Sequence, residues 1–165
     1  MHMRPTFVTG NPGRTYRFFT GVPVYEFGFG LSYTTFQKNW SDEPPCELDT
    51  TIIAQQLGED SDVILTYVEP PHAGEGGRPL KSLVAFERTP LIAARQRTTA
   101  KICLEAKVFT LANEVGNWVV EPGNWTIHVD TLQHKVIVQE PILREPVVVN
   151  EAVGRKPLPR AVWTK

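Results

Sequence analysis

The feature that most constrains the fold of this chain is a series of short segments in which apolar and polar residues alternate. In residues 125–130, Trp125, Ile127 and Val129 fall on one face, and residues 101–108 alternate in the same way. A period of two residues is that of a β-strand with one buried face. The alternation therefore predicts strands, and Trp125 is predicted to be a core residue.

Other segments are rich in β-branched and aromatic residues and end at Pro, Gly or Asn. Residues 50–55 also contain good helix formers, but their Thr and Ile residues favour a strand. About seven short strands with turn residues between them predict an all-β, two-sheet antiparallel sandwich over residues 31–140. The remaining strand candidates are 33–38, 50–55, 62–68, 82–88, 118–120 and 134–139.

Residues 121–124, with the sequence Glu-Pro-Gly-Asn, have the composition of a reverse turn. Pro presets φ for the second turn position, and Gly accepts the positive φ of the third. The turn is predicted to join strands 118–120 and 125–130 and to bring Trp118 close to Trp125. Flat tryptophan rings also stack on sugars, so Trp118 is a candidate sugar-stacking residue beside its alternative role in packing.

Residues 1–30, the arm, are rich in Gly, Pro and aromatic residues and have no regular period. Such spacing argues against a regular helix, and a flexible linker would not carry so many large rings. We expect an extended arm whose rings lie on another protein surface. Residues 141–165 are expected to form a C-terminal tail. The candidate docking residues are Arg14, Tyr16, Arg17, Phe18, Phe27, Phe29 and Tyr33.

The composition excludes several classes of protein. The net charge of −1 gives no broad basic field for nucleic acid or anionic lipid, and no apolar run approaches the roughly 20 residues of a membrane span. No secretory signal is recognisable, so the chain either stays in the cell or belongs to a longer secreted parent. Cys103 lies among apolar residues and is expected to be buried. A disulfide with Cys46 is the less favoured alternative.

No catalytic residue, cofactor site or metal site is predicted. The carboxylates of residues 42–62 lie mostly in polar segments, and nothing marks a converging pair of the kind that a glycosidase uses. The four histidines and two cysteines show no metal-binding spacing. The glycine-rich segment 72–77 lacks the pattern of a phosphate-binding loop.

Four segments resemble a known family. Residues 24–36, VYEFGFGLSYTTF, resemble the PFGYGLSYTTF stretch that opens the fibronectin type III-like domain of family 3 glycoside hydrolases. Residues 3–5 and 11–21, MRP and NPGRTYRFFTG, are similar to a stretch of the β-xylosidase branch. Residues 80–88, LKSLVAFER, and 117–127, NWVVEPGNWTI, are similar to later motifs in the same order.

The resemblance implies an immunoglobulin-like, fibronectin type III-like sandwich from the C-terminal end of such an enzyme. In those enzymes a barrel domain and an α/β domain carry the catalytic carboxylates, so this chain alone is expected not to be an enzyme. Its expected partners are those two domains, and its expected role is to pack on them and stabilise them. The resemblance also implies a secreted parent enzyme.

Two alternatives belong to other classes: a stand-alone carbohydrate-binding module that contacts polysaccharide, and a protein-interaction module. The sequence also departs from the family pattern. Residues 55–61 replace the usual NTG turn, Ala85 replaces a glycine, and residues after 139 match nothing in the family.

Overall fold

The computed structural model describes residues 2–30, 34–40, 47–54, 60–113 and 115–139. Tyr33, Cys46 and the predicted tail lie outside these residues. The backbone of 47–54 is described, but not its side chains. No helix within the described ranges is long and apolar enough to cross a bilayer.

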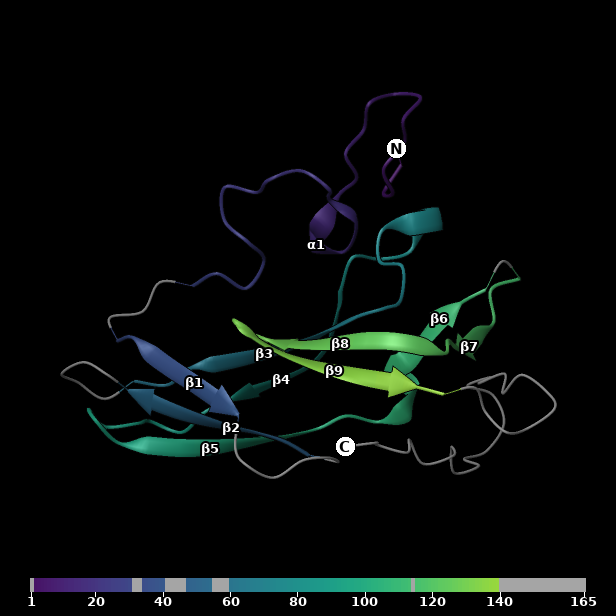
Figure 1. Cartoon of the computed structure of the whole chain (residues 1–165). Coiled ribbons are helices and arrows are strands. Elements are labelled where there is room, and N and C mark those ends of the chain that lie inside the picture. Colours follow the sequence, from purple (N-terminus) through teal and green to yellow (C-terminus); the bar gives the residue numbers. More distant parts are fainter. Residues whose placement is uncertain (1, 31–33, 41–46, 55–59, 114, 140–165) are drawn as a thin grey trace.

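Two antiparallel sheets form the body of the molecule, as the sequence predicts (Figure 1). One sheet has the strand order β1-β2-β5 and the other has the order β4-β3-β8-β9. A small third sheet pairs β6 with β7. The strands are β1 Phe36–Trp40, β2 Glu47–Ala54, β3 Val63–Glu69, β4 Ser82–Arg88, β5 Arg97–Cys103, β6 Thr110–Ala112, β7 Trp118–Val120, β8 Gly123–Val129 and β9 Leu132–Val138. The helical turns are α1 Thr15–Phe18, η1 Glu75–Gly77 and η2 Ala106–Phe109.

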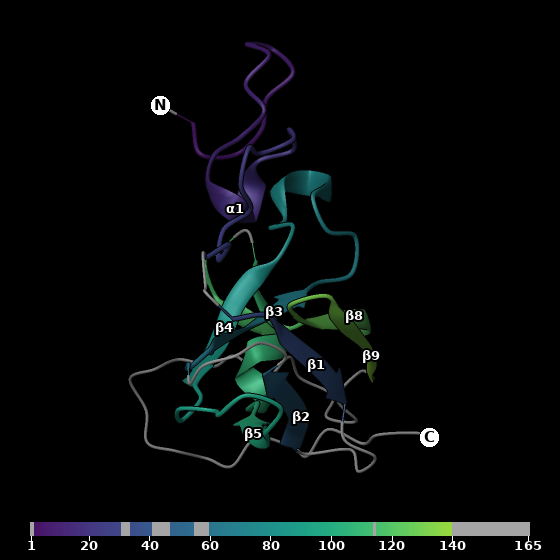
Figure 2. The same cartoon turned by 90° about the vertical axis from the view of Figure 1, so that its left-hand side faces the viewer.

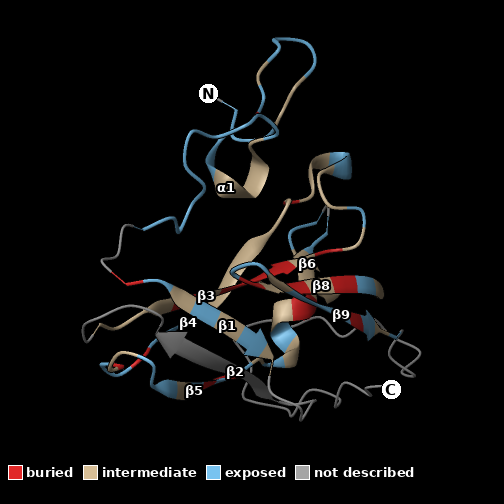
Figure 3. Ribbon diagram, turned by 60° about the vertical axis from the view of Figure 1, so that its left-hand side comes forward, coloured by how far each residue is buried: buried red, intermediate tan, exposed pale blue. Residues whose placement is uncertain are grey.

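The core lies between the two larger sheets, as the burial colouring shows (Figure 3). The inward residues of β8 are Trp125, Ile127 and Val129, and each is at most 2% exposed. The period-two prediction for this strand is confirmed, because every second side chain enters the sandwich. The core forms two clusters: Ile64, Ile92, Ala100, Ile102 and Val129; and Val68, Phe109, Trp125, Ile127 and Val136.

The predicted strand at 101–108 is wrong beyond Cys103. β5 ends there, and the chain forms the 3₁₀ turn η2, which is closed by a hydrogen bond from Val108 N–H to the Glu105 carbonyl at 3.0 Å. The turn carries the chain from the three-stranded sheet to β6 and buries Phe109. The ring of Phe109 packs edge-on against Trp125 with centroids 5.5 Å apart. Burial of this large ring outweighs the local strand pattern.

The predicted hairpin around residues 121–124 is also wrong. β7 pairs with β6, whereas β8 pairs with β3 and β9. The Pro-Gly pair therefore moves the chain from one sheet to another, and it does not reverse the chain within one sheet. The two tryptophans also differ in environment: Trp118 is 48% exposed, whereas Trp125 is 1% exposed.

Cys103 is exposed, which corrects the expectation that it is buried. Its neighbour Ile102 is 3% exposed and belongs to the core. Because side chains alternate along β5, the residue after a core residue faces outward. The apolar neighbours of Cys103 therefore do not report its own environment.

Candidate functional site

The arm folds into a compact unit above the four-stranded sheet (Figures 1 and 2). Backbone hydrogen bonds run from Arg14 N–H to the Met3 carbonyl at 2.8 Å and from Thr20 N–H to the Pro12 carbonyl at 2.9 Å. Between them, α1 makes one helical turn. The arm is thus less extended than expected, because its own backbone satisfies these polar groups.

Two sandwich amides donate to α1. Leu80 N–H bonds the Arg17 carbonyl at 2.6 Å, and Leu83 N–H bonds the Tyr16 hydroxyl oxygen at 3.2 Å. Leu80 lies between η1 and β4, and Leu83 is the second residue of β4. The arm therefore takes hydrogen-bond donors from the sandwich, which ties the two together at a defined position.

An aromatic cluster makes the second attachment. The ring of Tyr16 stacks on Phe27 with centroids 4.4 Å apart and meets Tyr67 of β3 edge-on at 5.8 Å. The Tyr67 hydroxyl donates to the Phe27 carbonyl at 3.2 Å. We call Tyr16, Phe27 and Tyr67 the clasp. Tyr67 is only 6% exposed although it points away from the sandwich core, because the arm covers it.

Gly28 lets the arm come this close to the sheet. Its φ is 92°, and a Cβ atom there would lie 2.5 Å from Leu65 Cδ1 and 2.9 Å from the Tyr67 hydroxyl oxygen. Any side chain at this position would be strained in its backbone and would collide with β3. Of the two glycines that alternate with rings in 27–30, Gly28 therefore serves close backbone approach, whereas a Cβ on Gly30 would meet nothing within 4 Å.

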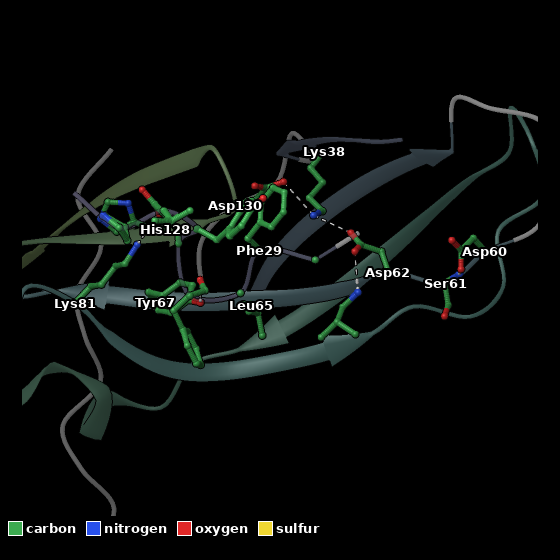
Figure 4. A pocket seen from close by; sticks show the side chains of 18 residues that line it. Phe29, Lys38, Asp60, Ser61, Asp62, Leu65, Tyr67, Lys81, His128 and Asp130 are labelled. Carbon is green, nitrogen blue, oxygen red and sulfur yellow. Dashed lines mark hydrogen bonds and ion pairs between the residues drawn. The ribbon is translucent and has the colours of Figure 1, made fainter. Parts of the chain in front are cut away.

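A groove of about 860 Å³ runs between the arm and the outer face of the sheet (Figure 4). Its charged groups are paired. Lys38 Nζ lies 2.7 Å from Asp62 and 3.1 Å from Asp130, and Lys81 Nζ lies 3.5 Å from Glu26 of the arm. The Lys38 pairs tie β1 to the segments before β3 and after β8, so they link the two sheets.

These contacts and the burial of the groove shift the pKa values of Lys38 and Tyr67. Burial works against the charge of Lys38, but the hydrogen bonds and charges of Asp62 and Asp130 outweigh it and hold the pKa of Lys38 above its ordinary 10.5. Burial raises the pKa of Tyr67 above 10.0, and Tyr16 and Glu26 raise it further. Both groups therefore keep their protons at neutral pH, when Lys38 is a cation and Tyr67 is a hydrogen-bond donor.

Apolar side chains remain exposed on the arm. Tyr25 and Phe29 stack on each other with centroids 4.9 Å apart, yet they are 69% and 59% exposed. Of the thirteen large hydrophobic residues that are exposed among the described residues, eight lie in the arm. The arm therefore carries most of the exposed large hydrophobic side chains of the described residues. The eight are Met3, Phe7, Val8, Val22, Val24, Tyr25, Phe27 and Phe29.

The predicted docking residues divide into two groups. Tyr16, Arg17 and Phe18 are partly buried in the arm, whereas Arg14, Phe27 and Phe29 are exposed. Two pairs of predicted residues are brought together: Tyr16 stacks on Phe27, and the guanidinium carbon of Arg17 lies 5.6 Å from the ring centroid of Phe18. Phe29 stacks on Tyr25, which is not among the predicted docking residues. Tyr16 and Phe27 contact their own sandwich and not another protein surface, and for the remaining rings the expectation stays a prediction.

Two carboxylates of the groove, Asp62 and Asp130, bind the same ammonium group of Lys38, which suits a structural link. Within the described part of the chain, no three His, Cys, Asp or Glu side chains gather as metal ligands.

Sequence reasoning missed the sandwich half of this surface. Tyr67, Lys81 and Leu83 hold the arm, but none of them was singled out. A signal for Tyr67 was present, because it alternates with Ile64, Thr66 and Val68 in a way that leaves a large ring on the outer face. An outward aromatic residue on a central strand indicates that something covers it.

The model of the "Fibronectin type III-like domain" family matches residues 62–133, which run from the residue before β3 to the start of β9. Two sequence relatives are a probable exo-1,4-beta-xylosidase of Aspergillus japonicus, 32% identical over 90% of this chain, and the exo-1,4-beta-xylosidase of Aspergillus niger, 30% identical over 94%. The chain carries the fibronectin type III-like domain of family 3 glycoside hydrolases. The resemblance found in the sequence motifs is thereby confirmed.

Solved structures agree with this assignment of the fibronectin type III-like domain. A family 3 exo-beta-xylosidase in complex with a xylobiose aziridine probe superposes with a TM-score of 0.76 at 26% identity and covers 90% of this chain. The beta-glucosidase of Listeria innocua superposes with a TM-score of 0.64 at 28% identity and covers 73%. The chain spans 22% of the length of both xylosidase relatives.

Proposed function

We propose that this chain is a non-catalytic accessory domain that packs on the catalytic domains of a family 3 glycoside hydrolase with β-xylosidase activity, and stabilises them. The observation that carries the proposal is the stacked, exposed pair of Tyr25 and Phe29 at the head of an otherwise well-packed sandwich. Covering exposed rings with a second surface is favourable, by about 25 cal/mol per Å² of apolar area removed from water.

The clasp supports the proposal, because it holds the arm before any partner arrives. Tyr16 and Phe27 are fixed against Tyr67, so the neighbouring Tyr25 and Phe29 need lose little conformational entropy on docking. An arm that is ordered in advance is better suited to a permanent interface between domains than to a transient encounter. The similarity to exo-xylosidases over 90% or more of the chain makes catalytic domains of that kind the natural partner.

A chimera tests the proposal. The segment of the Aspergillus niger exo-1,4-beta-xylosidase that matches this chain is deleted, or is replaced by this chain. We expect the deletion to lower the melting temperature of the remaining enzyme and the replacement to restore at least part of it. A replacement that melts at the temperature of the deletion variant would count against the proposal.

A matched pair of substitutions locates the effect. Phe29→Ser on the arm should remove much of the restored stability, whereas Phe86→Ser on β4 should not. Phe86 is a suitable control because it is the same residue type and is 71% exposed, compared with 59% for Phe29. Equal effects of the two substitutions would point away from docking through the arm.

Carbohydrate binding is a second candidate function, favoured by the 48% exposure of Trp118 on the small β6-β7 sheet. A titration with xylo-oligosaccharides tests it through tryptophan fluorescence. Saturable quenching that disappears in Trp118→Ala would support a polysaccharide contact. An unchanged spectrum at high sugar concentration would exclude it.

A further inference from the structure

The arm has an unusual charge composition. It contains three arginines, Arg4, Arg14 and Arg17, and one acidic residue, Glu26, which pairs with Lys81. Taking these from the 17 basic and 18 acidic residues of the chain leaves 14 basic and 17 acidic residues in 31–165. The arm is therefore net positive and the rest of the chain net negative.

These arginines have no acidic partner within ion-pair distance among the residues that the structure describes. By contrast, Arg78 of the η1 segment pairs with Glu121 at 2.7 Å, and Lys38 has two carboxylates. The chain thus has acidic residues in excess outside the arm but brings none of the described ones to Arg4 or Arg17.

Arg4 and Arg17 converge on one ring. Their guanidinium carbons lie 5.8 Å and 5.6 Å from the centroid of Phe18. Each contact is an attraction between a cation and the ring, so one aromatic side chain holds two guanidinium groups whose charge no described carboxylate neutralises. An anion beside either group would neutralise charge that the described part of the chain leaves unpaired.

The segment from η1 to Leu80 contacts both arginines. A Cβ atom on Gly77, which has a φ of 75°, would lie 3.1 Å from Arg4 Cδ and Nη1, so Arg4 rests on the backbone of the η1 turn. The Leu80 N–H fixes the backbone of Arg17 at 2.6 Å. In addition, Nε of Arg17 is covered from solvent and has no hydrogen-bond acceptor.

We propose that Arg4, Arg17 and Phe18 form a receptor for a carboxylate side chain on the catalytic part of the parent enzyme. The planar guanidinium fork matches a carboxylate with two parallel hydrogen bonds, and the ring excludes water from one side. A protein surface supplies this anion through Asp or Glu. This inference rests on the proposed function and adds the chemistry of the partner: an acidic residue beside the apolar surface that receives Tyr25 and Phe29.

The experiment uses this chain and the Aspergillus niger exo-xylosidase without its matching segment, with binding measured by biolayer interferometry at low and high sodium chloride. We expect the affinity of the unaltered chain to fall as salt rises, because ions screen the pair. The double variant Arg4→Gln/Arg17→Gln should bind at least about tenfold more weakly at low salt, with a flatter salt dependence. Arg17→Lys should fall between the two, since it keeps the charge but loses the fork.

Arg97→Gln is the matched control, since Arg97 is an exposed arginine on β5, away from the arm. It should bind as the unaltered chain does. Circular dichroism and melting temperature establish that each variant keeps its fold. If the unaltered chain binds and the double variant binds equally well at both salt concentrations, the inference is overturned while the proposed function stands. If the unaltered chain does not bind, the proposed function fails and the inference fails with it.

Discussion

Replacing Gly28 with alanine should release the arm from the sandwich while leaving the sandwich folded. The new Cβ would have to occupy space 2.5 Å from Leu65 Cδ1 and 2.9 Å from the Tyr67 hydroxyl oxygen, at a backbone φ of 92°. Gly30→Ala is the matched control, because nothing lies within 4 Å of a Cβ there. Both glycines belong to the same arm segment, so the pair separates the contact from a general effect of alanine.

The size of the effect follows from the contacts that are lost. A left-handed backbone costs about 1–2 kcal/mol for a residue with a side chain. Loss of the hydrogen bond from Tyr67 to Phe27 costs about 1 kcal/mol. Loss of the stacked Tyr16–Phe27 pair costs about 0.5–1.5 kcal/mol. The attachment of the arm should weaken by about 3 kcal/mol, which is roughly a hundredfold change in the opening equilibrium.

Two measurements report this release. Amide hydrogen exchange at Leu83, whose N–H is bonded to the Tyr16 hydroxyl oxygen, should become faster by up to about a hundredfold in Gly28→Ala. The pKa of Tyr67, which burial under the arm raises, should move down toward 10.0. Gly30→Ala should change neither. Unaltered exchange and an unaltered Tyr67 titration in Gly28→Ala would refute the assignment of the clasp.

Three further predictions concern charge, core packing and association. Raising the pH above 10.5 should lower the free energy of unfolding, because the stability that Lys38 contributes is complete below its unfolded pKa and is lost as pH rises through its raised folded pKa. Lys38→Arg should reduce this alkaline loss in urea titrations, and an identical pH profile in the variant would contradict the role of the ion pairs. Trp125→Ala should cost about 3–5 kcal/mol of unfolding free energy, and Trp118→Ala less than about 0.5 kcal/mol, because their exposures are 1% and 48%. Similar losses in urea unfolding would show that burial does not distinguish them. The isolated chain should self-associate through its exposed arm, and light scattering that finds only monomer at high concentration would weigh against an uncovered apolar surface.

Local patterns predicted most of the sandwich, because burial of one face imposes a period of two on each strand. β4 has the bounds expected for residues 82–88, and Trp125 occupies the core as its alternation indicated. The pattern does not contain information about partners along the sheet. For this reason, the hairpin between Trp118 and Trp125 was wrong, although both strands exist: β7 joins β6 and the next strand joins the larger sheet.

Sequence patterns identified the arm residues of the candidate site but not the sandwich residues that hold them. The rings and glycines of the arm stand out in the sequence, but their receiving surface on the sandwich depends on contacts between residues 40 or more positions apart, such as Tyr67 with Phe27. Such contacts arise from strand order and from which face each residue occupies. The meeting of Arg4 and Arg17 on Phe18 depends likewise on how the arm folds back, which no local period encodes.

The central claim is that the outward rings of the arm need a surface that the sandwich does not supply. Hydroxyl-radical footprinting measures this directly at Tyr25 and Phe29, first in the isolated chain and then in the chimera with the Aspergillus niger enzyme. The account predicts high reactivity at both rings in the isolated chain and strong protection in the chimera, with Tyr67 protected in both. Equal reactivity of Tyr25 and Phe29 in the two proteins would contradict it.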